Sequence, residues 1–190
     1  MAFEFGTVYI RDVSQSDVRD ALVQLMRENE HLPTEERGLE PMPENPTAGK
    51  PVRSFALMPA QDGWIAVLED GHSDDDGGLA DGLSELLSAE TMHFTYSDDA
   101  CTWSFVKYWD GQPLEAGGRH DVDFDAAALE FVRSHALPYF GVYYEEVAAS
   151  MGEDAPALAG SLRVVGDIIP KLPIGTQVLT FRRPGKPLPR

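Results

Sequence analysis

The chain has 190 residues, 43% of them hydrophobic, and a formal net charge of −17 at pH 7. A chain of this length can fold as one domain and bury a sizeable core without disulfides or metals. No apolar run approaches the ~18 residues that would cross a bilayer, and the N-terminus lacks a signal-peptide pattern. The single cysteine, Cys101, allows no internal disulfide. We therefore expect a cytoplasmic protein of one domain.

The negative charge is concentrated before Phe181. The residues after it contain four basic side chains and no acidic one, which leaves 11 basic against 32 acidic residues, a net charge of −21, in 1–181. Such a body repels phosphate backbones and anionic membrane surfaces, so we expect neither nucleic-acid nor membrane binding. A basic protein partner is the natural electrostatic complement. The alternative is that the acidity only keeps the protein soluble.

The first predicted elements are a strand and an amphipathic helix. Gly6–Val13 alternates apolar and polar residues, as a half-buried strand does. Ser16–Asn29 repeats apolar residues at helical spacing, and Ser14 or Ser16 can cap it. Its apolar stripe consists of Val18, Ala21, Leu22, Leu25 and Met26. Residues 30–53 hold five prolines and two glycines, so we expect a mobile loop there rather than a long regular element.

The next predicted elements are a hairpin and a second helix. Ser54–Gly71 predicts a β-hairpin that turns at Asp62-Gly63, because an Asp-Gly pair favours the tight turns of hairpins. Both strands carry apolar residues on both faces, which predicts a place inside a sheet that is covered on two sides. Leu79–Ala89 predicts a helix with a leucine stripe, and Asp76 can cap it.

A second hairpin is predicted at Thr91–Gly111, so the order helix, strand, strand occurs twice, within 7–71 and 76–111. Aligning Trp64 with Trp103 leaves an offset of one residue at the hairpin ends, which a β-bulge would absorb. We interpret the two stretches as copies of one α–β–β unit.

Beyond the second hairpin, Pro113 and the pair Gly117-Gly118 predict a break. Arg119–Phe124 alternates like a short edge strand. Asp125 can cap a third helix. We therefore expect the sheet to end near this point.

A C-terminal helical part at 125–169, with a separate helix at Tyr139–Met151, would cover the other face or an edge of the sheet. Thr176–Phe181 predicts a last strand, and 182–190 an extended basic tail. The expected fold class is α+β, as a single domain over 1–181. Its mostly antiparallel sheet would consist of the two α–β–β units and the N-terminal strand, with helices mainly on one face.

Two acidic stretches suggest metal ligands at first sight. In Glu69–Asp81, neither Gly77 nor Gly78 can serve as the loop glycine of an EF-hand that ends in an acid, so we interpret this stretch as a solvated loop. His120–Asp125 places aspartates on one face of a strand, but a charged edge that resists unwanted strand pairing explains the pattern. The histidines lack metal spacing, and no nucleotide-binding or hydrolase motif occurs. The sequence predicts no metal and no cofactor.

The remaining candidate side chains are a thiol and a dense aromatic group. Cys101 lies beside Asp98 and Asp99, and negative neighbours oppose the thiolate that a nucleophile needs, so we expect an incidental thiol. The aromatic residues either pack the sheet or, where the sheet is bare, form a binding face. The candidate binding residues are Trp64, Trp103, Trp109, Tyr108, Tyr143, His93, His120, Asp98 and Asp99.

The first functional hypothesis is a non-catalytic interaction protein in a bacterial-type cytoplasm, an inhibitor or immunity-like antagonist of a basic partner. If the repeat is real, Asp62 and the pair Asp98-Asp99 lie at one end of the sheet. The other end then holds Asp70, Asp74, Asp75, Asp76 and Asp110. Acidic groups at either end would steer association with a cationic surface.

The second hypothesis is a small-ligand-binding or enzymatic domain with a pocket between the sheet and the C-terminal helices. Trp103, Trp109 and Tyr143 would form its walls. His93 or His120 would be the proton-exchanging group. A subunit of a homo-oligomer is a third hypothesis.

Overall fold

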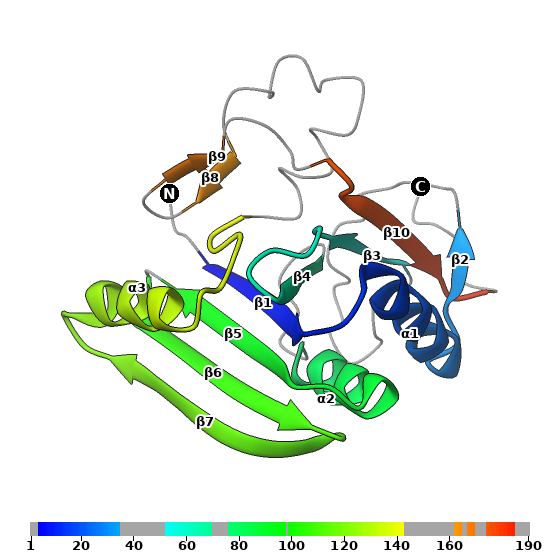
Figure 1. The fold of residues 1–190 in the computed structure, drawn as a ribbon, viewed down its shortest axis with the longest axis horizontal. Coiled ribbons are helices and arrows are strands. Elements are labelled where there is room, and N and C mark those ends of the chain that lie inside the picture. The colour runs from blue at the N-terminus through cyan, green and yellow to red at the C-terminus, as the bar shows by residue number, and fades with distance from the viewer. Residues whose placement is uncertain are drawn as a thin grey trace.

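The structure is a computed structural model that describes residues 4–34, 52–69, 76–97, 99–142, 162–164, 167–169 and 174–184. In chain order its elements are β1 (Glu4–Arg11), α1 (Gln15–Glu28), β2 (Leu32–Thr34), β3 (Val52–Leu57), β4 (Trp64–Glu69), α2 (Asp76–Leu87), β5 (Thr91–Ser97), β6 (Thr102–Trp109), β7 (Gln112–His120), α3 (Phe124–Ser134), β8 (Leu162–Val164), β9 (Asp167–Ile169) and β10 (Gln177–Arg182). Eight of these strands form one sheet in the order β2-β10-β3-β4-β1-β5-β6-β7, and every neighbouring pair is antiparallel (Figure 1). The strands β8 and β9 pair separately.

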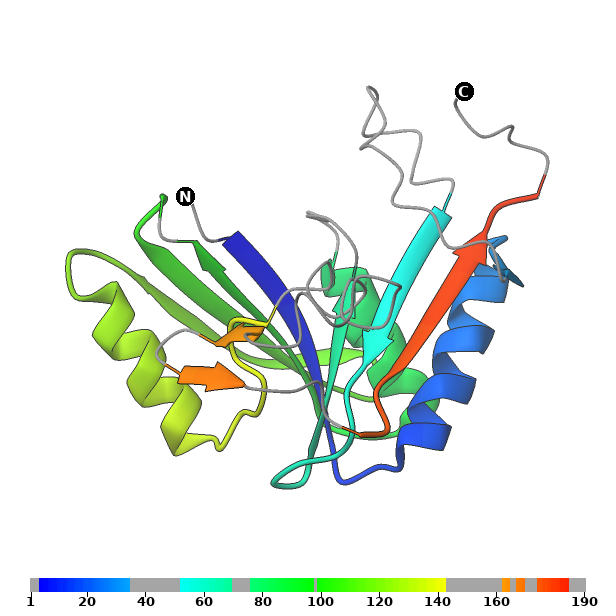
Figure 2. The ribbon, with the colours of Figure 1, turned by 90° about the horizontal axis from the view of Figure 1, so that it is seen from above.

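The described helices cover both faces of this sheet. Buried side chains of α1 and α2 pack with Val8 and Ile10 of β1 in one core. Those of α3 and of the segment 137–142 pack with Tyr9 of β1 in a second core on the opposite face. Figure 2 shows α1 and α3 on opposite sides of the molecule. The predicted α+β class is confirmed, and no helix in the described part of the chain is long and apolar enough to cross a membrane.

The first helix follows from its cap and its apolar stripe. Ser14 has an extended backbone, and its side-chain oxygen accepts a hydrogen bond from the backbone N–H of Asp17 at 3.1 Å. This bond satisfies one of the N–H groups that a helix leaves unpaired at its start. All five residues of the predicted stripe are buried. Both the cap at Ser14 and the stripe are confirmed.

The first hairpin is also confirmed, together with its turn. Asp62 and Gly63 have φ values of 53° and 82°, and Gln61 and Trp64 exchange two backbone hydrogen bonds of 2.9 Å. Two consecutive residues with positive φ make the tight turn whose twist suits antiparallel strands. The side chains of β4 are buried from Trp64 to Leu68, which confirms that this hairpin lies inside the sheet.

The second hairpin, β5–β6, lies in the same sheet but not in the equivalent place. The strand β1 pairs with β4, the second strand of the first hairpin, and with β5, the first strand of the second hairpin. The pairings Arg11 with Trp64 and Glu4 with Ser97 put the two hairpin turns at opposite ends of β1. The expectation that Asp62 and Asp99 share one end of the sheet is therefore wrong. That the two α–β–β segments are copies stays a prediction.

The stretch expected to break the sheet is instead its longest strand, β7. Asp110 and Gly111, with φ values of 51° and 72°, form a tight turn that leads from β6 directly into β7. The edge strand is therefore Gln112–His120 rather than Arg119–Phe124, and the prediction that Asp121, Asp123 and Asp125 lie along a strand is wrong. The third helix follows Asp123, two residues before the predicted cap at Asp125, and Asp123 makes no side-chain capping hydrogen bond.

The C-terminal region differs in part from its prediction. Within 125–169, α3 is helical, but β8 and β9 are strands. The predicted last strand is confirmed as β10, which pairs with β2 and β3. Residues 35–51, most of the predicted loop, and residues 143–161, most of the predicted separate helix, lie outside the described residues. So do residues 185–190 of the basic tail.

The burial of the helix-face leucines makes the fold testable. Leu22 is fully buried, so Leu22→Ala is expected to lower the free energy of unfolding by about 2–5 kcal/mol. Leu86 is only partly buried and packs at the margin of the same core, so Leu86→Ala should cost distinctly less. Urea denaturation of both variants measures the difference. Equal losses would contradict the difference in burial between Leu22 on α1 and Leu86 on α2.

Candidate functional site

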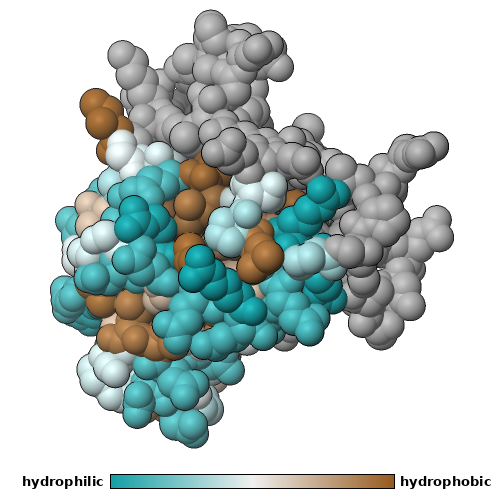
Figure 3. All heavy atoms as spheres, turned by 90° about the vertical axis from the view of Figure 1, so that its right-hand side faces the viewer, coloured by the Kyte–Doolittle hydropathy of each residue, from teal (hydrophilic) through white to brown (hydrophobic). Residues whose placement is uncertain are grey.

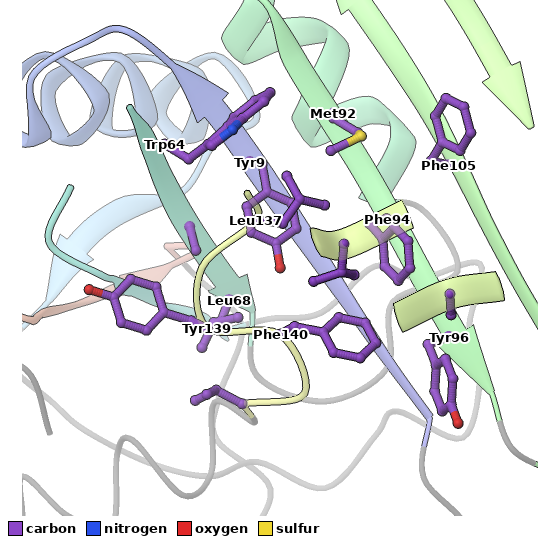
Figure 4. Packing of buried hydrophobic residues seen from close by; sticks show 14 of the residues in the cluster. Tyr9, Trp64, Leu68, Met92, Phe94, Tyr96, Phe105, Leu137, Tyr139 and Phe140 are labelled. Carbon is purple, nitrogen blue, oxygen red and sulfur yellow. The ribbon is translucent and has the colours of Figure 1, made fainter. Parts of the chain in front are cut away.

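Two of the candidate tryptophans lie in the core beneath α3. Trp64 is 2% exposed, and its indole N–H donates to the carbonyl oxygen of His135 at 3.0 Å. Trp103 stacks on Phe94 with 5.7 Å between ring centroids and contacts Phe131 of α3 at 5.0 Å. Figure 4 shows Trp64 and Phe94 among the buried side chains of this core. Both tryptophans hold α3 and the segment after it on the sheet.

Tyr108 and Trp109 end β6 and point to opposite faces, as successive strand residues do. Tyr108 packs at the margin of the core under α1 and α2, and burial, followed by the nearby charge of Asp81, raises its pKa. Trp109 is half exposed. Since Trp103 is buried under α3, the structure does not bring these side chains together as the walls of one pocket. The third predicted wall, Tyr143, lies outside the described residues.

The two candidate histidines lie away from the buried tryptophans. His93 precedes Phe94 on β5, so it points to the face opposite the one on which Phe94 stacks with Trp103. His120 is exposed at the end of β7 and pairs with Thr102, again on the other face from Trp103. Among the described residues, no group of three or more His, Cys, Asp or Glu side chains could hold a metal ion.

The outer face of α1 carries an open depression. Its lining residues are Asp20, Val23, Gln24, Arg27 and Glu28. In Figure 3, which shows this side of the molecule, most of the coloured surface is hydrophilic and the apolar residues gather in separate areas. Charged side chains from a single helix hold no ligand of their own. The depression is therefore a weak candidate for a binding site.

Exposed acidic side chains gather at both ends of the sheet. At the end where β1 finishes, they are Asp12, Asp62, Glu85 and Asp110. At the end where β1 starts, they are Asp99, Asp121, Asp123 and Asp125. Asp98 lies outside the described residues.

The strand β7 runs from one acidic group to the other along the edge of the sheet. All nine of its residues are exposed, and it is the last strand in the sheet order. In Figure 1 no described element lies beyond it. From Asp99 to Asp125 the chain holds six acidic and two basic residues, a net charge of −4. The sequence interpretation predicted a short charged edge strand at Arg119–Phe124 and missed the longer strand Gln112–His120.

Two glycines let β7 lie close to β6. A Cβ atom on Gly117 would lie 2.8 Å from the ring of Phe105, its partner across the strand pair. A Cβ atom on Gly118 would lie 2.3 Å from the carbonyl oxygen of Trp103 and 2.8 Å from the Cα atom of Ser104. Only glycine fits such a close backbone approach. An aromatic side chain covering an edge glycine restores part of the packing that the glycine lacks.

Two ion pairs fix the charged side chains of β7. The ammonium group of Lys107 lies 2.9 Å from the carboxylate of Glu115, and the guanidinium of Arg119 lies 2.6 Å from that of Asp121. In each pair, the hydrogen bond from the basic partner is the main cause that lowers the pKa of the carboxyl group. A second bond, from the backbone N–H of Asp123, holds the Asp121 carboxylate in place. The acids along β7 are thus held in fixed positions.

The comparisons with known proteins give this site no relative. No protein-family model, no curated protein and no solved structure matches the chain. The candidate site therefore rests on its own geometry: an open edge strand with exposed acids at both ends.

The close approach of β7 to β6 predicts a large effect of one methyl group. In Gly118→Ala the added carbon would collide with backbone atoms of β6, so the strand must shift, at a cost of about 1–3 kcal/mol in unfolding free energy. Ala116→Gly, at an exposed position two residues away, is the matched control and should cost below about 1 kcal/mol. Urea denaturation measures both. Similar losses would show that the approach is looser than described.

The ion pairs predict separate changes in carboxyl titration. Arg119→Gln removes the hydrogen bond that lowers the pKa of Asp121, so that pKa should rise towards its ordinary value. Because the pKa is lowered in the folded state, the pair stabilises the fold at neutral pH, and this contribution is lost as the pH falls through the folded-state pKa.

NMR titration of the carboxyl carbons in Arg119→Gln provides the measurement. Lys107→Gln is the matched control, since it should raise the pKa of Glu115 and leave Asp121 unchanged. An Asp121 pKa that does not respond to Arg119→Gln would rule out the bond.

Proposed function

We propose that this protein is a non-catalytic acidic binding protein whose partner is a basic protein, and that it acts as an inhibitor or immunity-like antagonist of that partner. The observation that carries the proposal is the pair of exposed acidic groups at the two ends of β7. A cytoplasmic location belongs to the same proposal.

The charge distribution suits recognition of a cationic surface over some distance. A net charge of −17 attracts a basic partner and speeds its encounter, while salt shortens the reach of this attraction to about 10 Å at 0.1 M. The exposed acids then select among partners, because a like charge brought against them is costly. Binding should therefore weaken steeply with salt.

The rigidity of the acidic groups favours binding as well. Asp110 lies in a two-residue turn, and Asp121 accepts hydrogen bonds from Arg119 and from the backbone of Asp123. The turn fixes the backbone of Asp110, and a carboxylate held by two hydrogen bonds, as that of Asp121 is, loses little conformational freedom when a partner binds. This supports the acids at the ends of β7 over the more scattered acids of α1 as the contact surface.

The proposal predicts that binding depends on the position of the acids and not only on their number. The test variant combines Asp110→Asn, Asp121→Asn and Asp123→Asn, which keep side-chain shape and remove three charges. The matched control removes three exposed charges around α1, with the substitutions Asp20→Asn, Glu28→Gln and Glu30→Gln. Both variants have the same net charge, so non-specific attraction to cations is equal in the two.

The measurement is quantitative capture from lysate of the source cells at about 50 mM and about 500 mM salt, a range over which exposed charges become strongly screened. We expect a basic protein that the unmodified chain and the α1 control retain at low salt and that the test variant loses. If every captured protein responds equally to the two variants, or none is basic, the proposed function is wrong.

A further inference from the structure

We propose that β7 is the docking element of this surface: an extended, basic segment of the partner protein adds beside β7 as a further strand of the sheet. This inference rests on the proposed function and specifies how the partner is held. Main-chain hydrogen bonds along the strand would supply affinity, and charges at its ends would supply selectivity.

The edge formed by β7 is open and long. Its nine residues are all exposed, whereas β2, at the opposite edge of the sheet, has three residues and includes Pro33. Since every antiparallel pair leaves alternate backbone groups pointing outwards, an edge strand presents a row of donors and acceptors to any chain that can lie extended beside it. The two edges of this sheet are therefore unequal, and β7 is the one suited to pairing.

The part of β7 available for pairing is its last six residues, Glu115–His120. Pro113 has no backbone N–H, and the register with β6 shifts next to it, which leaves Leu114 as the extra residue of a bulge. From Glu115 to His120 the pairing with β6 is regular. A partner strand would thus align with about six residues, a common strand length.

The glycines of β7 leave room for the partner's side chains. Gly117 and Gly118 put no side chain on either face at the middle of this stretch, and the ring of Phe105 lies against Gly117. An apolar residue of the partner strand opposite Gly117 would contact that ring edge. Cross-strand pairs of aromatic and β-branched residues are the favourable ones in antiparallel sheets. The edge therefore favours a strand with small or β-branched residues at its centre.

Charge decides between a basic partner and a second copy of this chain. Asp110 and Glu85 flank the start of β7, and Asp121 and Asp123 flank its end. A second copy paired in either direction would place its own acids against these, in addition to the repulsion between two chains of net charge −17. A segment with Lys or Arg at both ends meets opposite charges instead. The surface thus selects a basic strand.

The probes for the test are three labelled peptides of about nine residues. The first has two Lys at each end and alternating Val and Thr between them. The second replaces every Lys with Glu. The third keeps the Lys residues but has Pro at its centre, so its charge is unchanged while it cannot pair as a strand. Fluorescence anisotropy measures their binding to the full chain at low and high salt.

Two single variants of the protein separate the edge from the acidic surface. Because backbone N–H groups alternate between inward and outward along β7, one of Glu115→Pro and Ala116→Pro disrupts the ladder with β6 and the other blocks only the outer edge. The melting temperature identifies each variant, since only the variant that disrupts the ladder with β6 should lower the melting temperature clearly. Ala116→Pro removes no charge, and Glu115→Gln controls for the charge and the ion pair with Lys107 that Glu115→Pro removes.

We expect the first peptide to bind, the second not to bind, and the third to bind at least about tenfold more weakly than the first. The proline variant that retains the melting temperature should weaken the first peptide by at least about tenfold. Hydrogen exchange of the unmodified protein should slow at alternate amides of β7 when the first peptide is added. This readout applies even if neither proline variant folds.

The results that would contradict the docking proposal differ from those that would also contradict the proposed function. If the first and third peptides bind equally, or β7 amides show no slowing, the docking proposal is wrong while the proposed acidic binding function stands. If no cationic peptide binds at any salt concentration, both are wrong. If light scattering shows a dimer that the edge-blocking proline variant abolishes, the occupant of the edge is a second copy, and a basic partner strand is ruled out.

Discussion

The whole arrangement depends on β1 supplying apolar side chains to both faces of the sheet. Val8 and Ile10 enter the core beneath α1 and α2, and Tyr9 enters the core beneath α3. The same strand pairs with β4 on one side and β5 on the other, so it joins the two hairpins into one sheet. Burial also raises the pKa of Tyr9 above its ordinary value, because the interior disfavours the charged form. With β1 at the centre, both cores and both sheet edges have fixed places.

The two edges that result are protected to different degrees. One ends in the short strand β2, and the other in the long, exposed strand β7. The bulge at Leu114, the proline before it and the charges of Glu115 and Arg119 are devices by which edge strands avoid unwanted pairing. The bulge and the proline protect the start of β7, and the two charges lie on either side of Ala116–Gly118. The stretch Ala116–Gly118 itself carries no large side chain. A completely protected edge would need such devices along this stretch too.

Local signals in the sequence predicted local structure well. The cap at Ser14, the stripe of α1 and the turn at Asp62-Gly63 each depend on residues close together in the chain, so one sequence suffices to recognise them. The α+β class follows from the same signals. The insertion of β1 between the two hairpins depends on residues far apart, and no local pattern records it. This is why the expected positions of Asp62 and Asp99 were wrong.

The candidate site was harder to predict for a specific physical reason. Glycines that permit a close strand approach look in the sequence like glycines of a turn, so Gly117 and Gly118 indicated a break where the structure has a strand. The Asp110-Gly111 pair held the missing signal, because it favours a hairpin turn as strongly as Asp62-Gly63 does. The aromatic residues were misleading because the sequence does not show which of them another element covers. Strand alternation shows that Trp103 and Trp109 share a face, but not that α3 covers one and leaves the other exposed.

Acidity and an open edge together solve a problem that neither solves alone. A long open edge without charge would pair with a second copy of itself, and an acidic surface without an edge would bind cations with little geometric preference. In the docking mode that we propose, the acids at both ends of β7 would repel the acids of another copy of this chain. The same acids would attract a strand with basic ends. On this proposal, one set of charges opposes self-association and selects the partner, so the loss of these acids would weaken partner binding and expose the edge to self-pairing at the same time.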